Sequence, residues 1–152
     1  MKLVSFVIIL FITGTFNSSD VNFEPPIDKD VPIVSNFGEK THPVLLTTRF
    51  HNGIDYQVEP DSKIIASAAG TIKSVELIDE QWYQVIIDHG NGFETHYSQL
   101  SEVSDNLALA TKVEQHDVLG VAGIPVHSVT PMLHFSILKD GEFVDPALYL
   151  KK

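Results

Sequence analysis

Short apolar runs alternate with polar positions along most of the chain, from Ile33 to Leu150. Runs that are rich in β-branched and aromatic residues predict strands, because successive side chains of a strand point to opposite faces. No segment carries the apolar stripe of a long helix, which recurs every three to four residues. At most residues 101–108, SEVSDNLA, hold a short helical turn. The pattern therefore predicts a domain built mostly of strands.

Turn signals between the runs predict that neighbouring strands pair in antiparallel fashion. Asn91-Gly92 separates two apolar runs within residues 83–100, YQVIIDHGNGFETHYSQL. Asp140-Gly141 marks another turn within residues 133–146, LHFSILKDGEFVDP. Both dipeptides favour the two-residue turns of hairpins, which require a backbone with positive φ. We therefore expect a single, mostly antiparallel β domain.

The N-terminus has the features of an export signal. Lys2 precedes an apolar run, Leu3–Ile12, and polar and small residues follow it. A run of this length is too short to cross a bilayer but has the length of a signal-peptide core. We therefore expect residues 1–19 to be a signal peptide and the mature protein to have no membrane span. The alternative is an uncleaved N-terminal anchor.

After the signal, we expect a short lead-in and one domain. Residues 20–32 are acidic and contain proline, which predicts an extended linker. Residues 33–152 are long enough for one domain with its own core. The chain contains no Cys, so no disulfide can stabilise it. Its stability must come from the core, to which a bound metal can add.

The formal net charge of −10 narrows the classes of partner. A surface that binds nucleic acid needs clustered Lys and Arg side chains to meet the phosphates. Adsorption to an anionic membrane needs the same basic side chains. We therefore expect the partner to be neither nucleic acid nor an anionic membrane surface.

Two segments far apart in the sequence carry candidate metal ligands. His51 and Asp55 are four residues apart, so on a strand they point to the same face, and His134 can approach them from another strand. Imidazole and carboxylate are suitable zinc ligands, and three protein ligands leave a fourth position for water. On spacing alone, the alternative is a hairpin with an exposed His and a turn Asp.

The neighbouring residues resemble the lysostaphin/LytM-type zinc metallopeptidases, in order, from about Ser35 to Leu150. The similar blocks are SNFGEKTHPVLLTTRFHNGIDY, KIIASAAGTI, VIIDHGNGFETHYSQL, VLGVAG, LHF and VDPALYL. The resemblance implies a compact antiparallel β domain, a sheet or sandwich with a groove. It also implies Zn²⁺ bound by His51, Asp55 and His134. Members of the family mostly cut peptides of bacterial peptidoglycan.

The sequence departs from the family at two histidines that handle protons near the metal. The family's Tyr-x-His-Leu block ends here in Gln99-Leu100, and its His-Leu-His block begins with Met132. Gln can donate a hydrogen bond but cannot shuttle a proton near neutral pH, and the Met thioether is only a weak acceptor. Because each positioned acid–base group typically contributes about a hundred- to ten-thousand-fold in rate, little peptidase activity is expected to remain.

Three residues are candidate substitutes for the missing groups. His127 lies in a turn-rich stretch before the His134 strand, and a loop there can bring it near the metal. His96 neighbours Tyr97, and on a regular strand it faces away from Tyr97 and Gln99, out of the site. Tyr97 matches a site-facing Tyr of the family and could orient a ligand, or it packs in the core with its hydroxyl satisfied.

These observations support three hypotheses. The first is a domain that keeps zinc, has lost hydrolysis, and binds a peptidoglycan peptide or regulates a cell-wall hydrolase. The second is an active zinc metalloendopeptidase that uses His127, His96 or another route. The third is a structural or interaction domain whose metal residues are residual. Whether the protein is an enzyme stays open, and the export signal predicts a periplasmic or extracellular location in a bacterial envelope.

Overall fold

The computed structural model describes residues 21–27, 30–126 and 128–151, so the predicted signal peptide lies outside the described residues. The described elements are strands and one short 3-10 helix. They are β1 (Ile33–Ser35), β2 (Gly38–Thr41), β3 (Thr48–His51), β4 (Ile54–Gln57), β5 (Lys63–Ile65), β6 (Gly70–Ile78), β7 (Trp82–Gly90), β8 (Phe93–Val103), β9 (Lys112–Val113), β10 (Val118–Ala122), β11 (Met132–Lys139), β12 (Glu142–Val144) and η1 (Pro146–Leu148).

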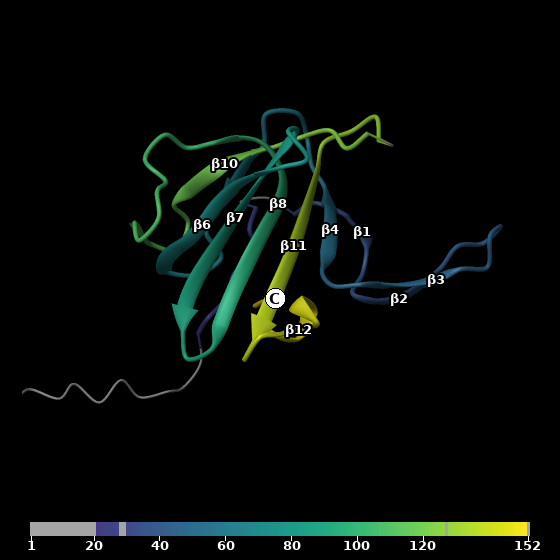
Figure 1. The fold of residues 1–152 in the computed structure, drawn as a ribbon, viewed down its shortest axis with the longest axis horizontal. Coiled ribbons are helices and arrows are strands. Elements are labelled where there is room, and N and C mark those ends of the chain that lie inside the picture. The colour runs from purple at the N-terminus through teal and green to yellow at the C-terminus, as the bar shows by residue number, and fades with distance from the viewer. Residues whose placement is uncertain (1–20, 28–29, 127, 152) are drawn as a thin grey trace, which may run out of the picture.

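One large antiparallel sheet dominates the molecule, and Figure 1 shows its long strands side by side. Its strand order is β1-β4-β11-β8-β7-β6-β9, while β10 pairs with β5 and β8, and β12 pairs with β11. Strands β2 and β3 form a separate hairpin that projects from the sheet beside β1 and β4 (Figure 1). The prediction of a mostly antiparallel β domain is confirmed.

Both predicted hairpin turns are present. Asn91 and Gly92 have φ of 52° and 76° between β7 and β8, and Asp140 and Gly141 have φ of 52° and 84° between β11 and β12. Positive φ at both central residues is the geometry that matches the right-handed twist of the flanking strands. The turn residues therefore help to set the register of β8 against β7 and of β12 against β11.

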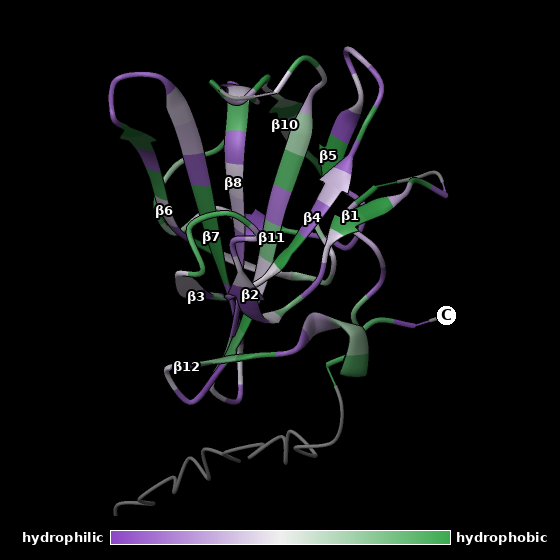
Figure 2. Cartoon of the chain, turned by 90° about the vertical axis from the view of Figure 1, so that its right-hand side faces the viewer, coloured by the Kyte–Doolittle hydropathy of each residue, from purple (hydrophilic) through white to green (hydrophobic). Residues whose placement is uncertain are grey.

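The core covers one face of the central strands. Figure 2 shows hydrophobic and hydrophilic residues alternating along β8 and β11, as expected when only one face of a sheet is buried. Side chains of the buried face are fully or almost fully inaccessible to solvent: Ile54, Tyr56, Ile72, Val85, Ile87, Tyr97, Leu100, Leu133, Phe135 and Ile137. The opposite face is left for polar residues.

The segment expected to be a linker packs on the domain over residues 21–27. Phe23 is completely buried and its ring contacts the His89 ring edge-on at 5.2 Å. Phe23 also forms a parallel bridge with Leu150, and Ile27 is only 6% exposed. Because these two large apolar side chains complete the core, this part of the segment belongs to the domain and is not an extended lead-in.

The helical turn expected at residues 101–108 is not formed. Its first residues continue β8, and turns follow. The 3-10 helix lies instead at Pro146–Leu148, where the Asp145 carboxylate accepts a hydrogen bond from the Ala147 amide at 3.0 Å. No helix among the described residues is long and apolar enough to cross a membrane.

Candidate metal centre

The three predicted metal ligands come from three strands, of which β4 and β11 are neighbours in the large sheet and β3 belongs to the separate hairpin. His51 is the last residue of β3, Asp55 lies on β4, and His134 lies on β11 directly opposite Asp55 in the antiparallel ladder. The chain bends at Asn52-Gly53 between β3 and β4, which do not pair with each other. The expected convergence of His51 and Asp55 is therefore present, but this bend produces it and not the alternation along one strand, and the pairing of β4 with β11 adds His134.

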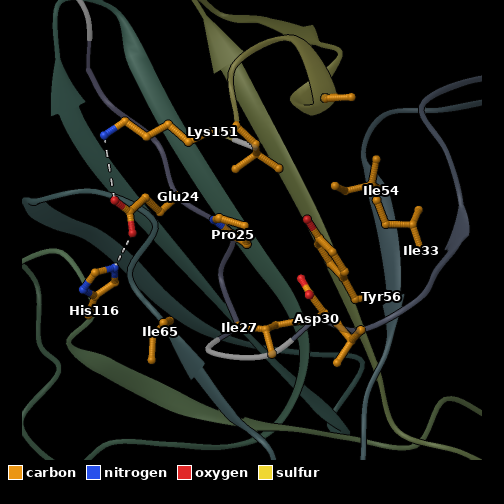
Figure 3. A pocket seen from close by; sticks show the side chains of 13 residues that line it. Glu24, Pro25, Ile27, Asp30, Ile33, Ile54, Tyr56, Ile65, His116 and Lys151 are labelled. Carbon is orange, nitrogen blue, oxygen red and sulfur yellow. Dashed lines mark hydrogen bonds and ion pairs between the residues drawn. The ribbon is translucent and has the colours of Figure 1, made fainter.

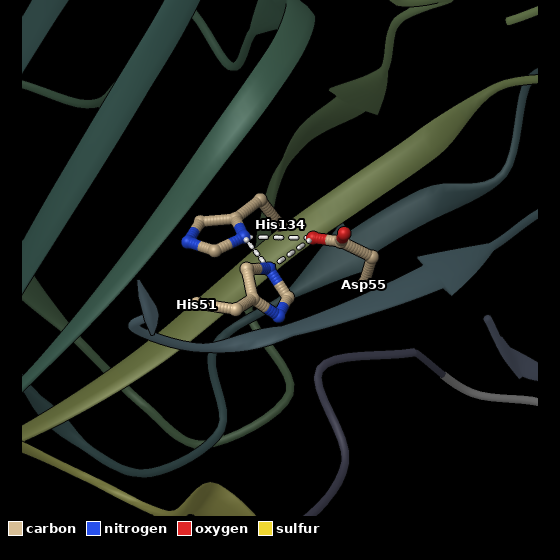
Figure 4. Close-up of side chains that lie close together, drawn as sticks. All are labelled: His51, Asp55 and His134. Carbon is tan, nitrogen blue, oxygen red and sulfur yellow. Dashed lines mark hydrogen bonds and ion pairs between the residues drawn. The ribbon is translucent and has the colours of Figure 1, made fainter. Parts of the chain in front are cut away.

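The ligand atoms of the three side chains point toward one another (Figure 4). Asp55 Oδ1 lies 2.7 Å from His134 Nδ1 and 3.2 Å from His51 Nε2, and the two ring nitrogens are 3.2 Å apart. One ligand atom from each residue lies within 4.8 Å of the others. All three side chains are half-buried, at 17–19% exposure, so the cluster remains accessible from one side.

The hydrogen bonds of His51 fix which ring nitrogen faces the cluster. Its Nδ1 lies 2.7 Å from the backbone oxygen of Asn36 and 3.2 Å from the Ser35 hydroxyl. A carbonyl oxygen only accepts, so Nδ1 carries the proton and Nε2 presents its lone pair to the other ligands. This is the tautomer that a metal ion requires.

His134 has the opposite orientation. Its Nε2 lies 3.1 Å from Asn52 Oδ1 and 3.1 Å from Ser136 Oγ. A proton on Nε2 leaves Nδ1 free for a metal beside Asp55. Sequence reasoning missed both residues, although Ser136 is two positions from His134 on the same strand and therefore on the same face.

Gly53 makes this close packing possible. A Cβ at this position would overlap the Phe135 backbone oxygen, the Ser136 hydroxyl and the His134 ring. The β3–β4 turn can therefore approach β11 only with glycine at this position. The close approach brings Asn52 to the outer nitrogen of His134.

The residues present fit a zinc ion. Two imidazole nitrogens with free lone pairs and one carboxylate are the ligand types that Zn²⁺ takes, and three protein ligands leave an open position. Zinc supplies a Lewis acid that polarises a carbonyl and acidifies a bound water. The outer nitrogens of both histidines are held by neutral groups.

A β-bulge brings Gln99 to the face that carries the cluster. Tyr97 and Leu100 are three residues apart, yet both are completely buried in the core. On a regular strand they would point to opposite faces, so the bulge leaves both Ser98 and Gln99 on the other face. Ser98 lies opposite His134, and Gln99 has a left-handed backbone with φ of 67°.

Met132 also lies on this face. It is two residues before His134 on β11 and forms an isolated bridge with Gly123. The amide of Gly123 in turn donates to the backbone oxygen of Gln99 at 2.7 Å. These neighbouring backbone contacts bring Gln99 and Met132 to the same end of the sheet face that carries the candidate metal ligands, called here the metal-bearing face.

The structure supports the core-packed alternative for Tyr97 and corrects the expectation for His96. Tyr97 points into the core, where its hydroxyl accepts a hydrogen bond from the Ser67 amide at 2.8 Å and lies 3.0 Å from Thr95 Oγ1. His96 was expected to face away from the site, but it lies opposite Ser136 on the metal-bearing face. His96 does face away from Tyr97, but Tyr97 lies on the core side, and the bulge after Tyr97 brings Gln99 to the face of His96. His127 lies outside the described residues.

Burial lowers the pKa of His96, and the neighbouring Glu94 raises it in part. Burial likewise raises the pKa of Tyr56 to about 12. At neutral pH the His96 imidazole is therefore biased toward its neutral form, and Tyr56 stays a phenol. Among the residues that the structure describes, His96 is the one titratable imidazole on this face besides the candidate ligands His51 and His134.

A pocket of about 570 Å³ lies on the core side of β4 and is not part of the cluster (Figure 3). Ile54 and Tyr56 line it, and these residues flank Asp55 on the strand. Because alternate side chains of a strand point to opposite faces, the pocket and the Asp55 carboxylate are separated by the sheet.

Comparison with known proteins agrees with this architecture. Residues 49–146 match the model of peptidase family M23. The chain is 36% identical over 114 residues to the DD-carboxypeptidase/endopeptidase Mpg of Neisseria meningitidis, covering 75% of this chain. It spans about a quarter of that relative, at 26% of its length.

Solved structures show the same fold. A chain in the SpoIIQ–SpoIIIAH pore-forming complex is 28% identical, with a TM-score of 0.73 over 88% of this chain and 94% of that one. The catalytic domain of lysostaphin from Staphylococcus simulans is 19% identical, with a TM-score of 0.63 over 80% of this chain and 93% of its own, and shows the fold alone. The predicted fold class is confirmed, and the chain belongs to peptidase family M23.

Proposed function

We propose that this protein is a zinc-binding M23 domain that binds peptide of the bacterial cell wall without hydrolysing it. One combination of features carries the proposal. His51, Asp55 and His134 converge on one point, while Gln99 and Met132 occupy the positions where the resemblance implies proton-handling histidines. A metal site is therefore kept while the groups that complete amide cleavage are replaced.

The replaced groups matter because amide cleavage needs a proton on the leaving nitrogen. The Gln99 carboxamide neither gains nor loses a proton near neutral pH, and the Met132 thioether is only a weak acceptor. Loss of one positioned acid–base group typically costs about a hundred- to ten-thousand-fold in rate. With both replaced, the face can still hold and orient a peptide carbonyl, but it has no side chain at these positions to move protons.

Two kinds of guest are compatible with such a face. A relative that is 27% identical over 121 residues, the peptidoglycan DD-endopeptidase ShyA of Vibrio cholerae, supports a peptide of peptidoglycan as the guest. The SpoIIQ–SpoIIIAH complex supports a protein partner for an M23 domain, and for this chain we propose a cell-wall hydrolase as that alternative. Either guest implies export to the periplasm or to the outside of a bacterial cell, directed by the signal peptide expected at residues 1–19.

An active zinc metalloendopeptidase is the second candidate function. The position of His96 favours it, because this imidazole shares the metal-bearing face and lies opposite Ser136, a neighbour of His134. His127 is the other candidate base. In this function one of these histidines would take the proton-handling role of the residues replaced by Gln99 and Met132.

Incubation of the zinc-loaded protein with purified peptidoglycan separates the two functions. For the non-hydrolytic function, the wild type releases no new amines, and the Gln99→His, Met132→His double variant gains release. The same double variant with His134→Ala should release none. Amine release by the wild type that is lost in His134→Ala would overturn the non-hydrolytic function, and its loss in His96→Gln or His127→Gln would identify the base.

A further inference from the structure

The β2–β3 hairpin extends into solvent, away from the rest of the domain. Its two strands form a two-stranded sheet of their own, and every residue from Glu39 to Phe50 is exposed. Figure 1 shows the hairpin projecting past β1 and β4. A two-stranded hairpin by itself is only marginally stable in water. A hairpin of this length in solvent is therefore expected to gain stability from a surface on which it rests.

The tip of the hairpin presents three consecutive aliphatic side chains to solvent. Val44, Leu45 and Leu46 are 80%, 68% and 76% exposed. The His42 ring holds the turn, because its Nδ1 accepts hydrogen bonds from the amides of Val44 and Leu45 at 3.3 and 3.1 Å. Leu46 has φ of 53°, a left-handed conformation that a bulky side chain rarely adopts. A run of exposed aliphatic residues on a turn held in this way is typical of a contact surface.

Two cations lie behind the tip. Lys40 and Arg49 are directly opposite each other in the ladder, although like charges at opposed positions destabilise a hairpin. Within the part of the chain that the structure describes, neither forms an ion pair. Two strand residues, about 7 Å, separate Lys40 from His42 at the turn. A surface that receives the tip would therefore be most favourable with a carboxylate at its rim.

The pocket of about 570 Å³ on the core side of β4 has these properties (Figure 3). Its aliphatic lining residues are Ile27, Val31, Ile33, Ile54, Ile65 and Leu150. Asp30 also lines it, is exposed, and forms no ion pair with another described residue. The Glu24 carboxylate, in contrast, is held by His116 Nε2 at 2.8 Å. Pockets of this size hold drug-sized ligands, so two or three aliphatic side chains can enter this one.

The pocket, the edge strand β1 and the hairpin lie on one side of the molecule. Figure 1 shows β1 at the edge of the large sheet, next to the hairpin. Ile33 of β1 lines the pocket, and Ile33 and Val34 are 45% and 49% exposed. An exposed edge strand with apolar side chains favours association with another chain. A twofold contact needs both halves of the interface on one side of the molecule, because each copy both inserts a tip and receives one.

We propose that two copies of this chain form a twofold dimer in which the β2–β3 hairpin of each copy places its aliphatic tip, residues 44–46, in the pocket of the other. Lys40 and Arg49 then lie near the Asp30 carboxylate of the second copy. A second copy is favoured over a different protein because this chain carries both an apolar tip with two cations and an apolar pocket with a carboxylate. The dimer is independent of whether the metal-bearing face hydrolyses a peptide.

Sedimentation velocity over a range of protein concentrations tests the dimer. The fraction of dimer in the wild type should rise with concentration, and Leu45→Asp should be monomeric, because a carboxylate is disfavoured in an apolar pocket. Leu109→Asp is the matched control. Leu109 is 74% exposed between β8 and β9, so this variant should dimerise like the wild type. A wild type that is monomeric at every concentration, or a Leu45→Asp variant that still dimerises, would overturn the proposal. Assemblies that keep growing beyond a dimer would overturn the twofold arrangement.

An exchange of charges tests which groups meet across the interface. Arg49→Glu and Asp30→Arg should each weaken dimerisation, because each places like charges opposite each other. Both residues are exposed, so neither change is expected to disturb the fold. The double variant should regain dimerisation, because opposite charges face each other again. A double variant that dimerises no better than the single variants would overturn the placement of the tip in this pocket.

Flotation with phosphatidylcholine vesicles separates the dimer from a contact between the tip and lipid. Wild-type protein should stay out of the floated fraction at concentrations where it dimerises. Protein that floats with the vesicles, loses this property in Leu45→Asp, and is monomeric without lipid would overturn the dimer and assign the tip to a membrane surface.

Discussion

Nδ1 of His134 lies 2.7 Å from Oδ1 of Asp55, across the pairing of β11 with β4. The two residues are 79 positions apart in the sequence and directly opposite each other in the sheet. His51 Nε2 completes the cluster at 3.2 Å from both atoms. The antiparallel ladder thus fixes the spacing of two candidate ligands, and the last residue of β3 supplies the third.

Purified protein should contain one zinc ion, and His51→Ala should contain none. A ligand that binds only the folded state stabilises it by about 2.7 kcal/mol at a concentration a hundred times its Kd. Chelation should therefore lower the melting temperature of the wild type and leave that of His51→Ala unchanged. Metal analysis and thermal unfolding check this, and wild-type protein free of stoichiometric metal after zinc loading would contradict it.

The outer contacts of His134 should matter for metal affinity. Asn52 and Ser136 both lie 3.1 Å from the same ring nitrogen, so either can hold its proton when the other is removed. We expect small effects from Asn52→Ala or Ser136→Ala alone and a loss of about 10- to 100-fold in zinc affinity from the pair.

The tautomer of His134 in the metal-free protein can be read from ring ¹⁵N chemical shifts. It shows whether the Asn52→Ala, Ser136→Ala double variant loses zinc affinity because the His134 ring is no longer held or because the fold is damaged. The double variant should lose the preference for a proton on Nε2. Ser101→Ala is the control, because its hydroxyl contacts only the backbone oxygen of Val121, at 3.3 Å, away from the cluster. An affinity in the double variant equal to that of the wild type would exclude a positioning role for Asn52 and Ser136.

Phe23→Ala should destabilise the domain by about 3–5 kcal/mol, the usual cost of truncating a fully buried Phe. The side chain is 0% exposed and packs against the rings of His89 and Phe93. Leu109→Ala is the control, at a residue 74% exposed, and should change stability by less than about 0.5 kcal/mol. Equal denaturant midpoints for the two variants would show that residues 21–27 are dispensable.

The domain should lose stability as the pH falls below the ordinary His value of 6.5. Burial lowers the pKa of His89, so the folded state binds fewer protons than the unfolded state in this window. The stability from neutral His89 is present above pH 6.5 and is lost as the pH falls through the lowered pKa. His89→Gln should flatten the dependence of the melting temperature on pH between 7.5 and 5.5. An equally steep slope in the variant would assign the effect to other groups.

The strands, the two hairpin turns and the three candidate ligands could be proposed from the sequence because each depends on a local pattern or on matched motifs. The alternation of apolar and polar residues defined the strands, and Asn91-Gly92 and Asp140-Gly141 defined two turns. The even spacing of His51 and Asp55 predicted a common direction on one strand, whereas in the structure the bend between β3 and β4 brings them together.

The position of Gln99 on the same face as His96 could not be predicted, because one extra residue in a strand reverses every later side chain. Gln99, with φ of 67°, is that residue, and no glycine marks it in the sequence. At this point β8 changes its neighbour from β11 to β10. The position of the bulge is therefore set by pairing with distant strands, and no local sequence pattern marks it.

The sequence by itself determined the residue types: strand formers, turn formers, two imidazoles and a carboxylate for a metal, and Gln99 and Met132 in place of histidines. Only the tertiary structure decided which side chains share a face. It joined Asn52 and Ser136 to His134. The physical reason is that the register between strands is set by packing over long sequence separations, which no local pattern encodes.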